Sequence, residues 1–144
     1  MSYLVDTNVL CESAKKHPER RVLEWLQHYE SKLYVSVISI GEIHRGIERL
    51  PDGKRKEMLH FWLESVCDSM KGRLLNFDLE TAHLWGKFKA DLEQKGMTIP
   101  SLDGQIAATA QQYQLTIVTR NVKDFLRTGL KILNPFVSPD MDEN

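Results

Sequence analysis

Three acidic residues stand at the ends of short apolar runs, where a metal ion could bind. Asp6 directly follows the first such run, Glu42 lies in about the first turn of a helical pattern after the second, and Asp103 lies in the first turn of a helix that opens at Ser101. If the runs are parallel strands, these acids meet at one edge of the sheet, where they repel one another unless a cation lies among them. An oxygen-only cluster suits Mg²⁺ or Mn²⁺ better than structural zinc.

Each acid also has a purely structural interpretation. Asp6 can cap the helix that follows it, and Asp103 can favour a helix N-terminus electrostatically. Glu42 can pair in solvent with Arg45 or Arg49. Taken one at a time, these explanations are the better ones. The predicted meeting of all three acids at one edge of a sheet favours the metal site.

A fourth candidate region, residues 118–125, follows another apolar run. Asn121 offers a neutral carbonyl ligand there, and Asp124 offers a full charge. The hydroxyls of Thr7 and Thr119 are suited to orienting carboxylates from outside the ligand shell. Thr119 is equally well explained as a β-branched strand residue.

The elements that must position these residues alternate along the chain. Short β-branched or aliphatic runs predict strands at residues 3–5, 33–37, 73–75, 116–119 and 131–133. Apolar stripes predict helices at 19–29, 39–50, 55–70 and 80–94, and a last major helix capped by Ser101. Strands and helices in alternation require crossover connections. The pattern therefore predicts an α/β fold, a three-layer α/β/α sandwich with a mainly parallel central sheet.

Composition sets wider limits. A chain of 144 residues with 42% hydrophobic and 27% charged residues fits one domain, which we place at residues 1–136, before a short acidic tail at 137–144 that we expect to be disordered. The net charge of -1 gives no global attraction for nucleic acid. No apolar run approaches the ~18 residues of a membrane span, so we expect a cytoplasmic protein. Cys11 and Cys67 lack zinc-site spacing and are interpreted as reduced thiols, with one disulfide left open.

The order of these motifs resembles that of the PIN-domain ribonucleases, and in length and motif sequence it is most similar to their VapC and FitB toxin branch. Residues 5–10, Val-Asp-Thr-Asn-Val-Leu, resemble the opening of that domain. Residues 36–47 resemble the segment that carries the family's glutamate, and residues 103–110 resemble the helix that carries its third acid. Residues 118–121 resemble the family's fourth site, and residues 134–136 resemble the C-terminal end of FitB-like members. The likeness extends from Tyr3 to Phe136.

The resemblance implies a metal-dependent endoribonuclease that hydrolyses RNA phosphodiester bonds. It implies that Asp6 and Asp103 bind a divalent ion and that Glu42 completes the acidic centre, with Asn121 as the fourth catalytic position. Mg²⁺ would be the ion, with Mn²⁺ able to replace it. Many family members have aspartate where this chain has Asn121. One fewer negative charge would weaken a second metal site, unless Asp124 turns inward. We therefore expect one firmly held metal and leave a second open.

The resemblance also implies partners. A VapB/FitA-like antitoxin would mask the site of a toxin, and two copies of the chain would form a homodimer. Large apolar side chains such as Trp25, Phe61 and Trp62 indicate the same dimer, since they are more than we expect one small sheet to cover. RNA would meet local basic groups, for which Arg45, Arg49 and Arg120 are the candidates. The five histidines are expected at the surface or in helix packing, with no role at the acidic cluster.

Two rival interpretations come from other classes of protein. A phosphotransfer receiver or a haloacid-dehalogenase-like phosphatase also places an aspartate after the first strand. That phosphatase needs Asp-x-Asp, whereas this chain has Asn8, and a receiver usually has lysine where Arg120 stands. A phosphoprotein intermediate would identify either one. The other rival is a catalytically silent PIN-like binding module, which a metal-dependent RNA cleavage assay would distinguish.

Overall fold

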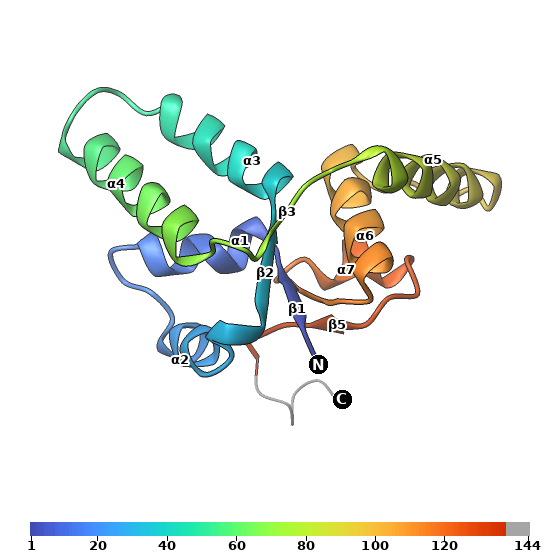
Figure 1. Cartoon of the computed structure of the whole chain (residues 1–144), viewed down its shortest axis with the longest axis horizontal. Helices are drawn as coiled ribbons and strands as arrows, with labels where there is room; N and C mark the ends of the chain where they lie inside the picture. The colour runs from blue at the N-terminus through green and yellow to red at the C-terminus, as the bar shows by residue number, and fades with distance from the viewer. Residues whose placement is uncertain (138–144) are drawn as a thin grey trace.

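Five parallel strands form one sheet in the order β3-β2-β1-β4-β5 (Figure 1). They are β1 (Tyr3–Val5), β2 (Leu33–Ser36), β3 (Leu74–Leu75), β4 (Thr116–Val118) and β5 (Ile132–Leu133). The computed structural model describes residues 1–137, so the predicted acidic tail lies outside the described residues, apart from Val137. Every predicted strand is present. Because β1 lies between β2 and β4, the strand order reverses beside β1, where ligands of such sheets usually bind.

Helices cover both faces of this sheet. They are α1 (Thr7–Leu10), α2 (Arg20–His28), α3 (Val37–Glu48), α4 (Lys54–Ser69), α5 (Leu79–Gln94), α6 (Ser101–Tyr113) and α7 (Val122–Leu126), with 3₁₀ turns η1 (Cys11–Ala14) and η2 (Glu30–Lys32). In Figure 1, α3 and α4 lie on one side of the strands and α5 and α6 on the other. The predicted α/β/α sandwich is therefore confirmed. None of the helices in residues 1–137 has the length and apolar content to cross a membrane.

The central strand shows why the core has two halves. Tyr3 and Val5 face a buried cluster that includes Val22 of α2 and Ile43 of α3. Leu4, between them, faces the opposite cluster, with residues of α6 and α7. This is the two-residue alternation of a strand that is covered on both faces. The sheet is thus packed on both faces, and this packing holds the backbone at its carboxyl edge, where the acids lie.

Two helix starts differ from the sequence prediction. Helix α3 begins at Val37, because the Ser36 hydroxyl accepts a hydrogen bond from the Ile38 amide and caps it. Glu42 therefore lies in the second turn of α3 and not in the first. The prediction that Ser101 caps α6 is wrong. Pro100 is the N-cap residue, and the Ser101 hydroxyl instead accepts a hydrogen bond from Lys89 of α5.

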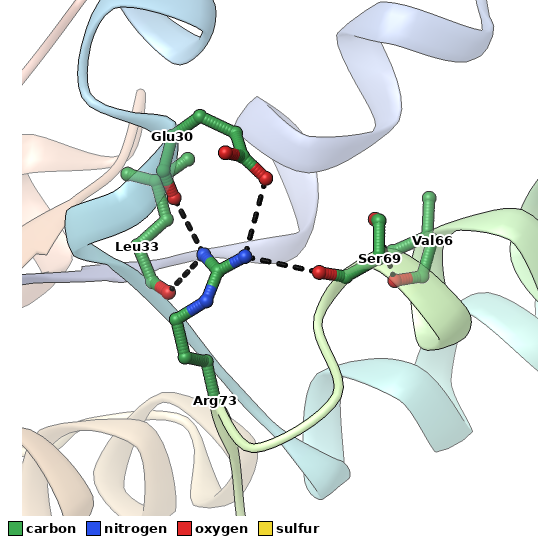
Figure 2. A network of polar contacts seen from close by, with 5 residues as sticks. All are labelled: Glu30, Leu33, Val66, Ser69 and Arg73. Carbon is green, nitrogen blue, oxygen red and sulfur yellow. Dashed lines mark hydrogen bonds and ion pairs between the residues drawn. The ribbon is translucent and has the colours of Figure 1, made fainter.

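Arg73 joins three segments that the sequence places far apart (Figure 2). Its guanidinium donates to the carbonyl oxygens of Glu30, Leu33 and Ser69, and also pairs with the Glu30 carboxylate at 3.1 Å. The carbonyl of Arg73 itself accepts a hydrogen bond from Val35 of β2. One side chain therefore ties the end of α4 and the η2 turn to the start of β2, beside edge strand β3.

We expect Arg73→Lys to lower the free energy of unfolding by about 1–3 kcal/mol, because an ammonium cannot reach all these acceptors in the forked geometry of a guanidinium. Urea unfolding of the variant and the wild type measures the difference. Arg20→Lys is the matched control, since Arg20 forms an exposed pair with Glu24 one turn away and should change stability by less than ~0.5 kcal/mol. If both changes altered the free energy of unfolding equally, the Arg73 hydrogen bonds would stabilise the fold no more than an exposed ion pair does.

Candidate metal centre

The sheet order brings the predicted acids together at one edge. Asp6 follows β1, and Thr119 follows β4, and these neighbours are in register through Val5 and Val118. Glu42 comes from α3, which leaves the end of β2, and Asp103 from the first turn of α6. Residues more than 110 positions apart thus share one small region of the molecule.

Neutral donors hold the Asp6 carboxylate. The Thr119 hydroxyl donates to Oδ2 at 2.9 Å, the Thr7 amide donates to Oδ1 at 2.8 Å, and the Asn8 side-chain amide approaches Oδ2 at 3.3 Å. Asp6 is only 5% exposed. Burial raises its pKa and the charge of Glu42 adds to that, while the bonds from Thr119, Thr7 and Asn8 act in the opposite direction. These contacts fix the side chain in place, and no ion pair among residues 1–137 involves it.

Thr7 links two of the acids. Its backbone amide binds Asp6, and its hydroxyl donates to Glu42 Oε2 at 2.9 Å. The predicted orienting role of the Thr7 and Thr119 hydroxyls is therefore confirmed by their contacts. Thr119 is fully buried, and its hydroxyl also accepts a hydrogen bond from the Asn121 amide at 3.0 Å.

Asn8 is a residue whose place in the site the sequence did not reveal. Its side-chain nitrogen lies 3.3 Å from the Thr119 hydroxyl, and its oxygen accepts a hydrogen bond from the Arg120 amide at 3.0 Å. Asn8 thus fastens the loop after β4 to the loop after β1. The motif Asp6-Thr7-Asn8 was visible in the sequence, but this role depends on β4 lying beside β1.

The pKa of Asp103 reflects both its burial and the charges of the neighbouring acids. Burial raises its pKa, and the charges of Asp6, Asp124 and Glu42 raise it further, to about 6. Asp124, which the sequence left open, is therefore close enough to contribute to the negative potential. Cys11 lies in the same negative potential. Burial raises the pKa of its thiol, and the charges of Glu42 and Asp6 raise it further, to about 11.

Helix packing places Asp103. Gly104, the next residue, is buried against Trp85 of α5, and a Cβ at that position would lie 3.2 Å from the Trp85 indole nitrogen. Any larger residue would therefore push α6 away from α5, unless the indole moved. The absence of a side chain at Gly104 lets the two helices approach closely and so helps to set the position of the adjacent carboxylate.

The donor set fits a hard divalent cation. Among residues 1–137, no ion pair to Lys, Arg or His involves Asp6, Glu42, Asp103 or Asp124. Lys15 and Arg55 line the cavity beside Glu42, but in this part of the chain neither forms an ion pair with these acids. Carboxylate oxygens without nitrogen or sulfur are the ligands that Mg²⁺ and Mn²⁺ prefer. The ligand chemistry of these residues therefore fits such an ion. Among residues 1–137, however, these carboxylates do not bring three ligand atoms within 4.8 Å of one another, so side-chain rotations would have to accompany ion binding.

Two predicted residues lie differently from the acids. Asn121 is exposed, its backbone amide donates to the Thr119 hydroxyl, and its carbonyl accepts a hydrogen bond from the Asp124 amide, so its side-chain role stays a prediction. The Arg120 guanidinium lies 4.5 Å from the centre of the Phe136 ring, in a cation–π contact. Its predicted contact with an RNA phosphate would have to form from that position.

We expect Asp103→Asn, measured in EDTA at pH 7, to leave the protein as stable as the wild type or more so, because one repelling charge is lost. The direction of this effect follows from the raised pKa of Asp103. The folded wild type binds the Asp103 proton more tightly than the unfolded chain does, so this residue's contribution to stability falls as pH rises from 3.8 to about 6. The variant should lack that fall. It should also lose most of the rise in melting temperature that Mn²⁺ gives the wild type.

Thermal melts across this pH range, with EDTA and with Mn²⁺, test this expectation. Asp52→Asn is the control, because the Asp52 side chain is fully exposed and pairs only with Lys56. If Asp103 served only the dipole of α6, its loss would cost ~0.3–1 kcal/mol in EDTA and leave the response to Mn²⁺ intact.

Known proteins resemble this chain in sequence and in fold. The family model for the PIN domain matches residues 3–130. The chain is 36% identical to toxin FitB of Neisseria gonorrhoeae, over 92% of this chain and 97% of that protein, and 37% identical to VapC ribonuclease Y4jK of Sinorhizobium fredii, over 92% and 96%. The crystal structure of FitAcB from N. gonorrhoeae superposes with a TM-score of 0.89 at 35% identity, covering 94% of this chain and 99% of that one. The crystal structure of DNA-bound VapBC from Salmonella typhimurium superposes with a TM-score of 0.82 at 25% identity, covering 94% of this chain and 98% of that one. The chain belongs to the PIN-domain family.

Proposed function

We propose that this chain is a metal-dependent endoribonuclease that hydrolyses RNA phosphodiester bonds and acts as the toxin of a toxin–antitoxin pair. The observation that carries the proposal is that Asp6, Glu42, Asp103 and Asp124 lie close enough for their charges to act on Asp103, with no ion pair to any of them among residues 1–137. Relatives at 36% and 37% identity, named toxin FitB and VapC ribonuclease Y4jK, support the substrate class and the toxin role.

We propose Mg²⁺ as the ion, with Mn²⁺ able to replace it, because the donors are carboxylate oxygens. Asp6 and Asp103 would hold it. A bound divalent ion supplies a water of lowered pKa and neutralises charge on the phosphoryl oxygens. Asp124 adds charge on the Asp103 side of the cluster, so it is the residue on which a second ion would depend.

The chain's own groups have distinct tasks in this mechanism. Thr119, Thr7 and Asn8 keep the Asp6 carboxylate in one orientation. Glu42, held through its Oε2 by the Thr7 hydroxyl, keeps Oε1 available to orient an attacking water and accept its proton. Asn121, at the start of α7, remains the proposed fourth catalytic position.

A VapB/FitA-like antitoxin is the proposed partner. The similar solved structures include FitAcB from N. gonorrhoeae and DNA-bound VapBC from S. typhimurium. Beside Glu42 this chain has a cavity of about 320 Å³ between α3 and α4, lined mainly by apolar side chains including Ile43, Leu59 and Trp62. An apolar segment could fill it while a neighbouring Arg or Lys reached the carboxylates, where a cation is favoured.

The homodimer also remains a proposal. The sequence suggested Trp25 for the interface. Its ring centroid lies 5.0 Å from that of Tyr3 and 4.9 Å from that of Tyr29, so Trp25 packs mainly at the periphery of the hydrophobic core. On α4, Phe61 is 71% exposed and Met58 63% exposed. These two side chains are the part of the predicted apolar surface that a second copy would cover. Light scattering at micromolar concentration checks the mass.

The geometry argues against the phosphotransfer interpretation. Position 8, where such a phosphatase needs a second aspartate, carries Asn8, whose amide is bound on both sides by Thr119 and the Arg120 backbone. Asn8 thus has a structural role, and its carboxamide cannot act as the general acid that protonates a leaving group. The names of the relatives favour RNA hydrolysis as well.

We expect purified protein to cleave RNA with Mg²⁺ or Mn²⁺ and to lose that activity in EDTA. Asp103→Asn should abolish cleavage. Thr119→Val, which keeps the shape of a buried residue but removes the hydroxyl that positions Asp6, should slow cleavage by roughly 10–100-fold. Asp52→Asn should cleave as the wild type does. Gel analysis of a mixed RNA pool measures all four proteins.

Three results would contradict the proposal: cleavage that persists in EDTA, cleavage by Asp103→Asn at the wild-type rate, and folded wild-type protein that leaves every RNA in the pool intact with either ion. The last result would favour the catalytically silent binding module. Circular dichroism of each variant confirms that it is folded before its activity is compared.

A further inference from the structure

A second group of metal-ligating side chains lies away from the carboxylate centre. His44 and Glu48 are one helical turn apart on α3, and His60 faces them from α4. Both imidazole Nε2 atoms approach Glu48 Oε1, His60 at 3.0 Å and His44 at 3.4 Å. One ligand atom from each of the three residues lies within 4.8 Å of the others. The three side chains thus converge on one point between two helices.

This point is separate from the carboxylate centre. At about 100° per residue, His44 and Glu48 lie about 200° and 240° around α3 from Glu42. Between these two sides runs the buried stripe of Ile43 and Ile47. The cluster therefore faces the other side of the α3–α4 hairpin, and no residue of it takes part in the proposed RNA cleavage.

We propose that His44, Glu48 and His60 form a binding site for a transition-metal ion of the Zn²⁺ class, which clamps α3 to α4. Two imidazoles and one carboxylate are a ligand set that Zn²⁺ adopts with a water in the fourth position. Imidazole nitrogen selects such ions over Mg²⁺, which prefers oxygen. This inference does not depend on the proposed ribonuclease function.

The distances support an ion at this point. Ligand atoms about 2.0–2.2 Å from a tetrahedral ion lie roughly 3.4 Å from one another. The two observed Nε2–Oε1 distances are 3.4 and 3.0 Å, so small side-chain rotations would admit an ion without a backbone movement. The pair on α3 has the four-residue spacing that places two ligands on one face of a helix.

The surroundings leave the open coordination position accessible. A cavity of about 300 Å³ adjoins both histidines and is lined further by Leu63, Glu64, Cys67 and Asp68. Its two carboxylates add negative charge that attracts a cation. The Lys56 ammonium donates to the Glu48 backbone oxygen at 3.3 Å, a contact that already holds the start of α4 to the end of α3. An ion would add a second clamp further along the hairpin.

The ordinary explanation is a pair of surface hydrogen bonds between histidine and glutamate. The side chains are 39–57% exposed, so those bonds alone would contribute little to stability. The two explanations differ in one measurable respect, because only a metal site gives nitrogen-ligated ion binding that is lost with either histidine.

The experiment uses the full chain in the Asp103→Asn background, which weakens the carboxylate centre. Co²⁺ is titrated and followed by its visible spectrum, and Zn²⁺ is titrated by calorimetry. We expect the strong visible bands of tetrahedral Co²⁺ with nitrogen ligands. His60→Gln and His44→Gln should each abolish these bands and weaken Zn²⁺ binding at this site roughly tenfold or more. His83→Gln is the matched control, since His83 is exposed on α5.

Melting in EDTA confirms that the variants fold, and two separate histidine variants guard against the failure of one. Addition of Zn²⁺ should raise the melting temperature of the Asp103→Asn protein and of its His83→Gln derivative, but not of its His60→Gln or His44→Gln derivatives. Weak octahedral Co²⁺ bands only, or Zn²⁺ affinities that agree within twofold among all four proteins, would overturn the proposal.

Discussion

Like-charged carboxylates are crowded at the carboxyl edge of the sheet, and neutral groups hold them there without neutralising them. The Thr119 hydroxyl and the Thr7 amide fix Asp6, and the Thr7 hydroxyl fixes Glu42. Burial raises the pKa values of Asp6 and Asp103, and the neighbouring carboxylates raise them further, so the ionised forms are unfavourable without a bound cation. The interactions that stabilise the rest of the fold must offset this cost, and a bound divalent ion removes it.

The architecture supplies that support away from the acids. Strand β1 is covered on both faces, with Leu4 in one core cluster and Val5 in the other, so Asp6 starts from a fixed backbone position. Arg73 fastens the end of α4 to the chain around η2, at the opposite end of β2 from the start of α3, the helix that carries Glu42. Stability and function are therefore separated in space, which lets the site tolerate unfavourable charge.

The sequence predicted the strands, the longer helices and the three main acids, because apolar periodicity and the position of an acid after a strand are local signals. Asn8 escaped notice, since its contacts with Thr119 and Arg120 depend on which strands are neighbours. Asp124 stayed undecided because α7 is too short to show a period. Likewise, His44 and His60 meet only through the packing of α3 on α4, which no spacing along the chain reveals.

The measurement that tests the account most directly is the pKa of the Asp103 side chain, followed by the carboxyl ¹³C chemical shift as pH is varied, with EDTA and then with saturating Mg²⁺. In EDTA the pKa should be about 6, raised by burial and by Asp6, Asp124 and Glu42. With Mg²⁺ it should fall well below its usual range, because the cation stabilises the ionised form. An ordinary pKa that Mg²⁺ does not change would show that the carboxylates neither crowd one another nor bind the ion.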